Sequence, residues 1–164
     1  MSSAPLREDE GFVLERLLPY ELSVTANRVS RLFARRYADA FGLAIPEWRC
    51  LAVIGRHGLI PATGIAERTA MDKVKVSRAV ASLLAKGLIR RSPHPADRRL
   101  ALLAFTPKGR RIYERIIPLA RRTEAELMAA LGPADRAALS AMLARIAAQV
   151  QVIDGAAAEP GGID

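Results

Sequence analysis

One amphipathic helix constrains the fold of this chain more than any other feature of its sequence. Asp72 is a favoured residue type at helix N-termini, and it precedes a run with apolar residues at helical spacing. The apolar positions, at i, i+4, i+7 and i+8, are Val76, Val80, Leu83 and Leu84. They share one face, which is predicted to be buried, while the basic residues of the run point elsewhere. Gly87 tolerates left-handed backbone, so the helix is predicted to end at about Lys86.

Two short apolar runs follow this helix. Residues 88–91 and 99–105 flank a loop, residues 92–97, that contains two prolines. This pattern predicts a β-hairpin, and the prolines suit its exposed tip because a missing N–H there breaks no ladder. The tip is predicted to carry Asp97, Arg98 and Arg99.

The positive charge of the protein is concentrated in this part of the chain. Residues 68–115 contain thirteen Lys or Arg and three acidic residues, a balance of +10, whereas the whole chain carries +8. A concentrated basic patch indicates a phosphate backbone as partner, since a merely solvated face more often mixes signs. Aromatic residues make up only 5% of the chain, which argues against a base-stacking surface for single strands. Double-stranded DNA is therefore the predicted partner.

Further helical patterns surround the basic segment. A helix capped by Thr63 is predicted over residues 64–69, and together with the helix after Asp72 it makes a helix-turn-helix. The other predicted helices cover residues 19–41, residues 46–57 beginning at Pro46, residues 107–131 with a kink at Pro118, and residues 134–150. Residues 154–164 are predicted to be disordered.

The composition of the chain limits the cellular compartment in which it is expected and the disulfide or metal sites that it can form. Cys50 is the only cysteine, so the chain can form no internal disulfide and no zinc cluster from cysteines. The N-terminus lacks a basic segment leading into an apolar run, and no stretch of about 18 uninterrupted apolar residues occurs. We therefore expect a cytoplasmic protein with no membrane partner. His57 and His94 have too few partners for a metal site, so neither a metal nor a cofactor is predicted.

Three stretches of the sequence resemble the MarR (multiple antibiotic resistance regulator) family of winged-helix transcription factors. They are Val76-Ser77-Arg78 with Val80, Leu83 and Lys86-Gly87-Leu88-Ile89; the hairpin signature Asp97-Arg98-Arg99; and Phe105-Thr106-Pro107-Lys108-Gly109. Their order and spacing together are specific, and the flanking helices extend the similarity over roughly residues 15 to 150. The resemblance implies a homodimer in which the first and last two helices interlock, and a ligand-responsive repressor more often than an activator.

The expected fold is mainly α with a small β-hairpin wing: a winged helix-turn-helix with N- and C-terminal dimerisation helices. Five segments are expected: 1–11, a flexible arm; 12–45, the N-terminal dimerisation helix; 46–106, the DNA-binding region; 107–152, the C-terminal dimerisation helices; and 153–164, a flexible tail.

Two sets of candidate site residues follow. The residues predicted to bind DNA are Lys73, Lys75, Ser77, Arg78, Arg90, Arg91, Asp97, Arg98 and Arg99. Arg99 is expected to reach the minor groove, where a narrow A·T-rich groove attracts arginine, and Asp97 to orient it. The resemblance implies a pocket for a small organic effector between the dimerisation helices and the helix-turn-helix, and the residues predicted to border it are Phe33, Tyr37, Trp48 and Arg49. An arginine there can hold a carboxylate by paired hydrogen bonds, although core packing is the alternative role for each of the four.

Two alternatives to this hypothesis remain open. The winged helix can serve as a protein-interaction module, because fold alone does not determine function. A regulator can also sense redox through a reactive cysteine, although a small buried core residue is the favoured interpretation of Cys50. The sequence shows no nucleophile, base and orienting residue at meaningful spacing and no phosphate-binding glycine loop, so an enzyme is not expected.

Overall fold

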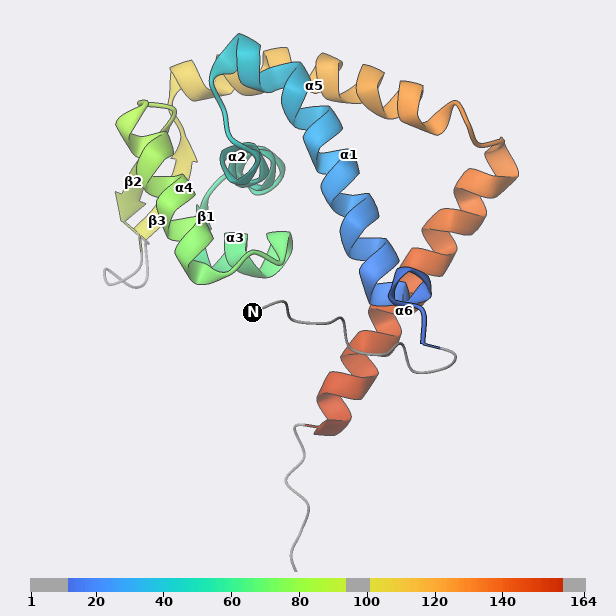
Figure 1. Cartoon of the computed structure of the whole chain (residues 1–164). Coiled ribbons are helices and arrows are strands. Elements are labelled where there is room, and N and C mark those ends of the chain that lie inside the picture. Colours follow the sequence, from blue (N-terminus) through green and yellow to red (C-terminus); the bar gives the residue numbers. More distant parts are fainter. Residues whose placement is uncertain (1–11, 94–100, 158–164) are drawn as a thin grey trace, which may run out of the picture. The chain divides into compact units, whose positions relative to one another are not determined.

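The computed structural model describes residues 12–93 and 101–157, and the chain divides into two compact units, Met1–Thr123 and Glu124–Asp164 (Figure 1). The first unit contains the sheet and the helices as far as residue 123. The second contains the end of helix α5, Pro107–Met128, and helix α6, Pro133–Ala157.

Two helices open the described chain after a short 3-10 turn, Leu14–Arg16. Helix α1 spans Leu18–Phe41 and helix α2 spans Ile45–His57. The predicted helices at residues 19–41 and 46–57 are therefore confirmed to within one residue. Each begins with a proline in its first two positions, where a missing N–H costs no hydrogen bond.

The helix-turn-helix consists of α3, Ala62–Thr69, and α4, Lys73–Ala85. The chain turns between them at Ala70, whose φ of 51° is left-handed. The predicted cap at Thr63 is wrong. Pro61, the last residue of a two-residue strand, occupies the N-cap position without a side-chain hydrogen bond, so the helix begins at Ala62, directly after the strand and before Thr63.

A three-stranded antiparallel sheet packs beside these helices in the order β1-β3-β2. Strands β2, Ile89–Pro93, and β3, Ala101–Phe105, form the predicted hairpin, with Ile89 opposite Phe105. The predicted tip residues Asp97, Arg98 and Arg99 lie outside the described residues, as does His94. Strand β1, Ile60–Pro61, was not predicted; it has two residues, too few for an alternating pattern, and it forms by pairing Ile60 with the distant Leu103.

Helix α5 spans Pro107–Met128 and contains Pro118, and helix α6 spans Pro133–Ala157. Helix α6 therefore includes residues 153–157, which were predicted to belong to the flexible tail. The reason is that this stretch has no proline, and its one glycine costs a helix only about 1 kcal/mol relative to alanine.

One hydrophobic core supports the winged helix. Its fully buried large side chains include Leu43, Leu51, Ile54, Ile65, Val76, Leu83, Leu88, Leu103 and Ile116. The predicted buried face of α4 enters this core through Val76, Val80 and Leu83, while Leu84 is half-buried. Each fully buried aliphatic side chain contributes about 1.5–3 kcal/mol, so the core holds the opposite face of α4 outward. The predicted fold class, mainly helical with a small sheet, is confirmed.

Candidate DNA-binding surface and ligand pocket

Helix α4 presents an exposed basic face opposite its buried apolar face. Asp72 Oδ1 accepts a hydrogen bond from the Lys75 amide at 2.7 Å, and its Oδ2 lies 3.0 Å from Lys75 Nζ. The bond from the Lys75 amide holds the pKa of Asp72 below its usual range, so the cap is ionised at neutral pH. Lys73, Ser77 and Arg78 are exposed, as is Lys75. All four predicted DNA-contacting residues of α4 are thus accessible to a duplex.

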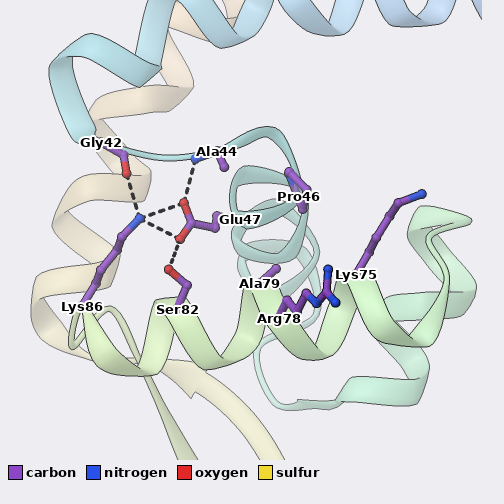
Figure 2. Close-up of a pocket in the computed structure, with 9 residues that line it drawn as sticks. All are labelled: Gly42, Ala44, Pro46, Glu47, Lys75, Arg78, Ala79, Ser82 and Lys86. Atoms are coloured by element: carbon purple, nitrogen blue, oxygen red, sulfur yellow. Dashed lines mark hydrogen bonds and ion pairs between the residues drawn. The ribbon is translucent and has the colours of Figure 1, made fainter.

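A groove of about 410 Å³ runs along α4 where α4 faces the start of α2 (Figure 2). Its lining residues are Gly42, Ala44, Pro46, Glu47, Lys75, Arg78, Ala79, Ser82 and Lys86. Lys75 and Arg78 stand toward one end of the groove, and Glu47 and Lys86 toward the other. The exposed basic face of α4 therefore adjoins a cluster of polar groups around the buried Glu47.

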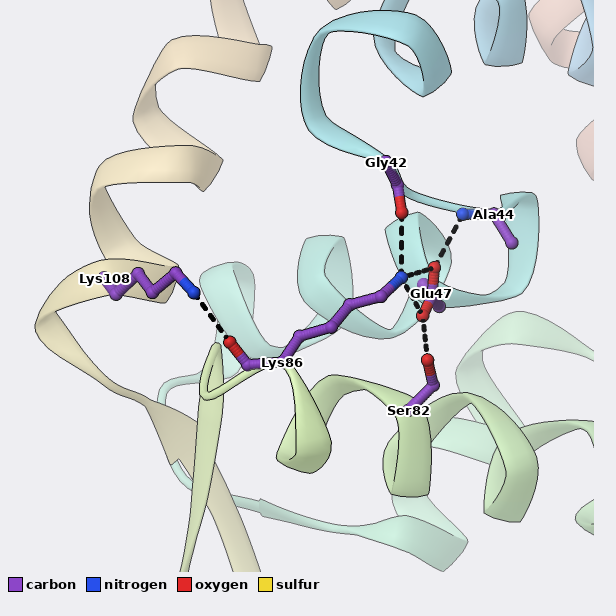
Figure 3. A network of polar contacts seen from close by, with 6 residues as sticks. All are labelled: Gly42, Ala44, Glu47, Ser82, Lys86 and Lys108. Atoms are coloured by element: carbon purple, nitrogen blue, oxygen red, sulfur yellow. Dashed lines mark hydrogen bonds and ion pairs between the residues drawn. The ribbon is translucent and has the colours of Figure 1, made fainter.

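Glu47 is the centre of that cluster (Figure 3). Its carboxylate accepts hydrogen bonds from the Ala44 amide at 2.7 Å, from Ser82 Oγ at 2.5 Å, and from Lys86 Nζ at 2.7 and 2.8 Å. Lys86 Nζ also donates to the Gly42 carbonyl at 2.8 Å. The cluster ties the end of α1 and the start of α2 to the last turn of α4. Glu47 was not among the predicted site residues, because its partners Ser82 and Lys86 lie 35 and 39 residues further along the chain.

The Glu47 carboxylate is ionised despite its burial. Desolvation raises its pKa, but the hydrogen bonds from Lys86, Ser82 and the Ala44 amide outweigh that effect, and the pKa lies below its ordinary value of 4.5. Because the folded-state pKa is lowered, the stability that this group contributes is present above pH 4.5. It is lost as the pH falls through the lowered value.

Thr106 and Gly109, two residues of the motif that resembles the MarR family, hold the junction between β3 and α5 together. Thr106 Oγ1 donates to the Gly87 carbonyl at 2.7 Å and accepts from the Gly109 amide at 3.0 Å. A Cβ at Gly109 would overlap the Leu88 carbonyl oxygen. Lys108 Nζ adds a bond to the Lys86 carbonyl at 2.9 Å. The start of α5 is therefore joined closely to the end of α4.

The two described wing arginines lie on opposite faces of strand β2, because adjacent strand residues alternate. Arg91 borders a hollow of about 210 Å³ that also includes Thr63 at the start of α3 and Val80 of α4. Arg90, although exposed, points to the other face. The structure therefore brings Arg91, but not Arg90, toward the helix-turn-helix.

All four residues predicted to bind an effector line one pocket of about 230 Å³. The pocket residues are Val29, Ser30, Phe33, Tyr37, Ile45, Trp48 and Arg49, from α1 and α2. Arg49 Nη2 donates to Ser30 Oγ at 3.0 Å. Burial raises the pKa of Tyr37 to about 12 although Arg49 opposes the shift, so this hydroxyl is neutral at physiological pH. The volume is below the range of about 300–1,000 Å³ for drug-sized ligands and suits a single-ring compound.

Aromatic rings continue from this pocket to the wing. The Trp48 ring centroid lies 5.6 Å from that of Tyr37 and 5.9 Å from that of Tyr113, which in turn lies 5.1 Å from Phe105. Tyr113 also packs against Gly55, where a Cβ would overlap its ring. Tyr113 was not among the predicted site residues; its only signal in the sequence is an aromatic residue one turn after the Thr106–Gly109 motif.

Cys50 lies in the core, as the favoured interpretation predicted. Its side chain is 0% exposed, and burial, aided by the Glu47 charge, raises the thiol pKa from 9.0 to about 11. The thiolate fraction at pH 7 is therefore about 100-fold below that of an ordinary thiol, and the thiolate is the reactive form.

We expect a disulfide reagent at pH 7 to label Cys50 of the folded protein at least about 100-fold more slowly than Cys50 of the protein unfolded in guanidinium. Rapid labelling of the folded protein would restore the redox hypothesis.

The described residues offer no obvious metal centre. Within residues 12–93 and 101–157, no group of three His, Cys, Asp or Glu side chains is placed to hold an ion. His57 Nε2 instead accepts a hydrogen bond from Arg68 Nε at 3.2 Å.

Comparison with known proteins places this architecture in a family. Residues 41–100 match the sequence profile of the MarR family. The chain is 27% identical over 145 residues to the transcriptional repressor NicR of Pseudomonas putida, covering 88% of this chain and 90% of NicR. A probable transcriptional regulator of Pseudomonas aeruginosa is 30% identical, with a TM-score of 0.73 over 82% of this chain and 99% of that one. The chain belongs to the MarR family.

This MarR-family protein is thus a DNA-binding transcriptional regulator, and its relatives indicate no enzyme family. It is also similar to BpsR of Bordetella bronchiseptica, with 25% identity and a TM-score of 0.74 over 83% of this chain and 96% of BpsR. The DNA binding of BpsR is regulated by 6-hydroxynicotinic acid.

Proposed function

We propose that this chain is a cytoplasmic, homodimeric repressor that binds pseudo-palindromic duplex DNA and releases it when a small organic ligand binds. The observation that carries the proposal is the exposed basic face of α4 on a winged helix-turn-helix. In this arrangement the second helix enters the major groove, and a dimer reads two half-sites about one helical turn apart. The proposed contacts are Lys73, Lys75, Ser77, Arg78, Arg90, Arg91, Asp97, Arg98 and Arg99.

The helices outside the winged helix support the dimer. The segment Pro133–Gly155 of α6 has the length and the apolar composition of a membrane-spanning helix. None of its apolar stretch is buried within the chain. Its apolar residues Leu139, Met142, Leu143 and Val150 are 40–55% exposed, and Phe12, Leu17 and Leu18 near α1 are 45–57% exposed. An isologous interface between two copies would cover these surfaces without a membrane. We assign residues 12–45 and the helices after residue 106 to this interface, and residues 46–106 to DNA.

The pocket between α1 and α2 is the proposed effector site. Phe33, Tyr37 and Trp48 offer aromatic walls, and Arg49 offers a cation for a carboxylate. A related protein responds to a hydroxylated aromatic acid, so 6-hydroxynicotinic acid is a reasonable first probe here. Release requires that the ligand prefer the dimer geometry that fits DNA poorly, because equal affinity for both geometries shifts nothing.

The proposal is tested with the full-length protein and labelled duplexes from the DNA immediately upstream of its coding region. Light scattering should give twice 17.8 kDa, and affinity for an inverted repeat should fall steeply with salt. Titration with 6-hydroxynicotinic acid or benzoic acid should change Trp48 fluorescence and weaken DNA binding about 5 to 150-fold.

Arg49→Met should lose about 1.5–3 kcal/mol of carboxylate binding while retaining DNA affinity without ligand. Arg56→Met, two turns along the same helix and outside the pocket, is the matched control and should behave as wild type. A monomer, or a protein whose retention on duplex DNA does not depend on salt, would favour a protein-interaction module instead.

A further inference from the structure

The first turn of α2 borders two separate hollows at once. Ile45, Trp48 and Arg49 line the aromatic pocket, whereas Pro46 and Glu47 line the groove against α4. A displacement of this single helical turn therefore alters both the proposed ligand site and the contact surface of the proposed recognition helix.

Short polar contacts, in which the buried atoms all have hydrogen-bond partners, link this turn to α4. The side chain of Glu47 is 5% exposed and that of Lys86 is 38% exposed, and their ion pair measures 2.7 Å. Among the described residues, no buried side-chain N or O atom lacks a hydrogen-bond partner. Charge-assisted bonds of this length are directional and about twice as strong as neutral ones, so the turn and the helix end are held in one relative position.

The same cluster reaches the other elements that meet here. Lys86 Nζ binds the carbonyl of Gly42 at the end of α1, and the Lys86 carbonyl accepts from Lys108 in the first turn of α5. Figure 3 shows Lys86 extending across this junction, with Glu47 and Gly42 at its ammonium end and Lys108 at its backbone end. One lysine therefore joins the last turn of α4 to α1, α2 and α5.

From these contacts we infer that Glu47 and Lys86 are positioning residues that transmit occupancy of the aromatic pocket to the recognition helix. The inference rests on the proposed function and names the regulation of its site. A ligand against Trp48 and Arg49 moves the first turn of α2, and Glu47 then carries the end of α4 with it or breaks its bond to Lys86. Either event changes how α4 meets DNA, because packed elements switch between discrete arrangements rather than deform continuously.

The aromatic series from Trp48 through Tyr113 to Phe105 is the competing route, and it leads to the wing instead. The two routes make different predictions. If the polar route couples the pocket to DNA binding, loss of the Glu47–Lys86 pair abolishes the effect of the ligand on DNA affinity. If the aromatic route does so, that effect remains.

The decisive variants are Lys86→Met and Glu47→Ala, studied in the full-length dimer with 6-hydroxynicotinic acid and benzoic acid as probes. Lys86→Met leaves the Glu47 carboxylate bound to Ser82 and the Ala44 amide, so the fold should persist. Glu47→Ala leaves Lys86 half-exposed and able to turn to water. Both variants should bind the probe with an affinity within about 3-fold of wild type by Trp48 fluorescence. The ratio of DNA affinities without and with probe should fall from about 5 to 150-fold to below about 2-fold.

Lys73→Met is the matched control for the lost charge. It makes the same chemical change on the same helix and should weaken DNA binding with and without probe alike, leaving the ratio unchanged. The double variant of Glu47 and Lys86 should lose no more of the ratio than Glu47→Ala alone, because removing the carboxylate already eliminates its bonds to both Lys86 and Ser82.

Hydrogen exchange provides a readout that does not involve DNA. The probe should alter exchange of amides in residues 82–88 of wild type but not of Lys86→Met. If wild type releases DNA on binding the probe and Lys86→Met releases it equally, the polar coupling is overturned while the proposed function stands. If wild type binds neither probe, or binds one without releasing DNA, the proposed effector function fails and the coupling with it.

Discussion

Replacing Arg78 by alanine should remove most of the ability of this protein to distinguish its operator from other duplexes. Arg78 is exposed on α4 and stands beside Lys75 along the groove in Figure 2. A bidentate contact from arginine to guanine is the commonest specific contact in the major groove and contributes about 1–3 kcal/mol of discrimination. The expected loss is therefore about 5 to 150-fold in the ratio of specific to non-specific affinity, measured by fluorescence anisotropy at constant salt.

Arg56→Ala is the control for the loss of one positive charge. Arg56 is exposed in the last turn of α2, outside the proposed DNA contacts and the segments assigned to the dimer interface, and should leave that ratio unchanged. If Arg78→Ala weakens all duplexes equally, Arg78 contacts phosphate rather than bases. If the variant is indistinguishable from wild type, α4 is not the recognition helix.

Replacing Gly109 by alanine should produce the largest loss of stability of any single methyl group added to the winged helix. The added Cβ would overlap the Leu88 carbonyl oxygen, which is backbone and cannot rotate aside. Inserting a methyl group into a packed site usually costs about 1–3 kcal/mol, and a backbone obstacle favours the upper end. A cost of about 3 kcal/mol corresponds to a fall in Tm of roughly 6 to 12 °C for a chain of this size, measured by circular dichroism.

The same substitution at Gly155 separates steric overlap from the general effect of alanine. A Cβ at Gly155 meets nothing within 4 Å, and this residue lies inside α6. Gly155→Ala should leave Tm unchanged or raise it slightly, since alanine is the better helix former. An equally stable Gly109→Ala variant would mean that the β3–α5 junction relaxes easily and does not fix the end of α4.

The junction and the Glu47 cluster together explain how α4 is held. Its apolar face is buried by the core, its N-terminus is capped by Asp72, and its last turn is bonded to three other elements through Lys86. Because α4 is fixed in this way, the DNA contacts that we propose for it would cost little conformational entropy on binding.

The sequence alone determined the features that depend on neighbours close along the chain. The apolar spacing at Val76, Val80 and Leu83 predicted α4 and its buried face, and Asp72 and Gly87 predicted its ends. The hairpin strands followed from two apolar runs around prolines. The pocket residues Phe33, Tyr37, Trp48 and Arg49 were anticipated through family resemblance, and they converge in the structure, although their role in binding a ligand stays a prediction.

Only the tertiary structure decided the features that join distant residues. Strand β1 exists because Ile60 and Pro61 find partners in β3, some forty residues later, and two residues leave no pattern to detect. The bond between Glu47 and Lys86 joins positions 39 apart, and either residue alone reads as an ordinary helix-end charge. Burial explains the difference. A carboxylate becomes the centre of a cluster only when folding removes water and brings the donors within reach, and no local pattern records which donors those will be.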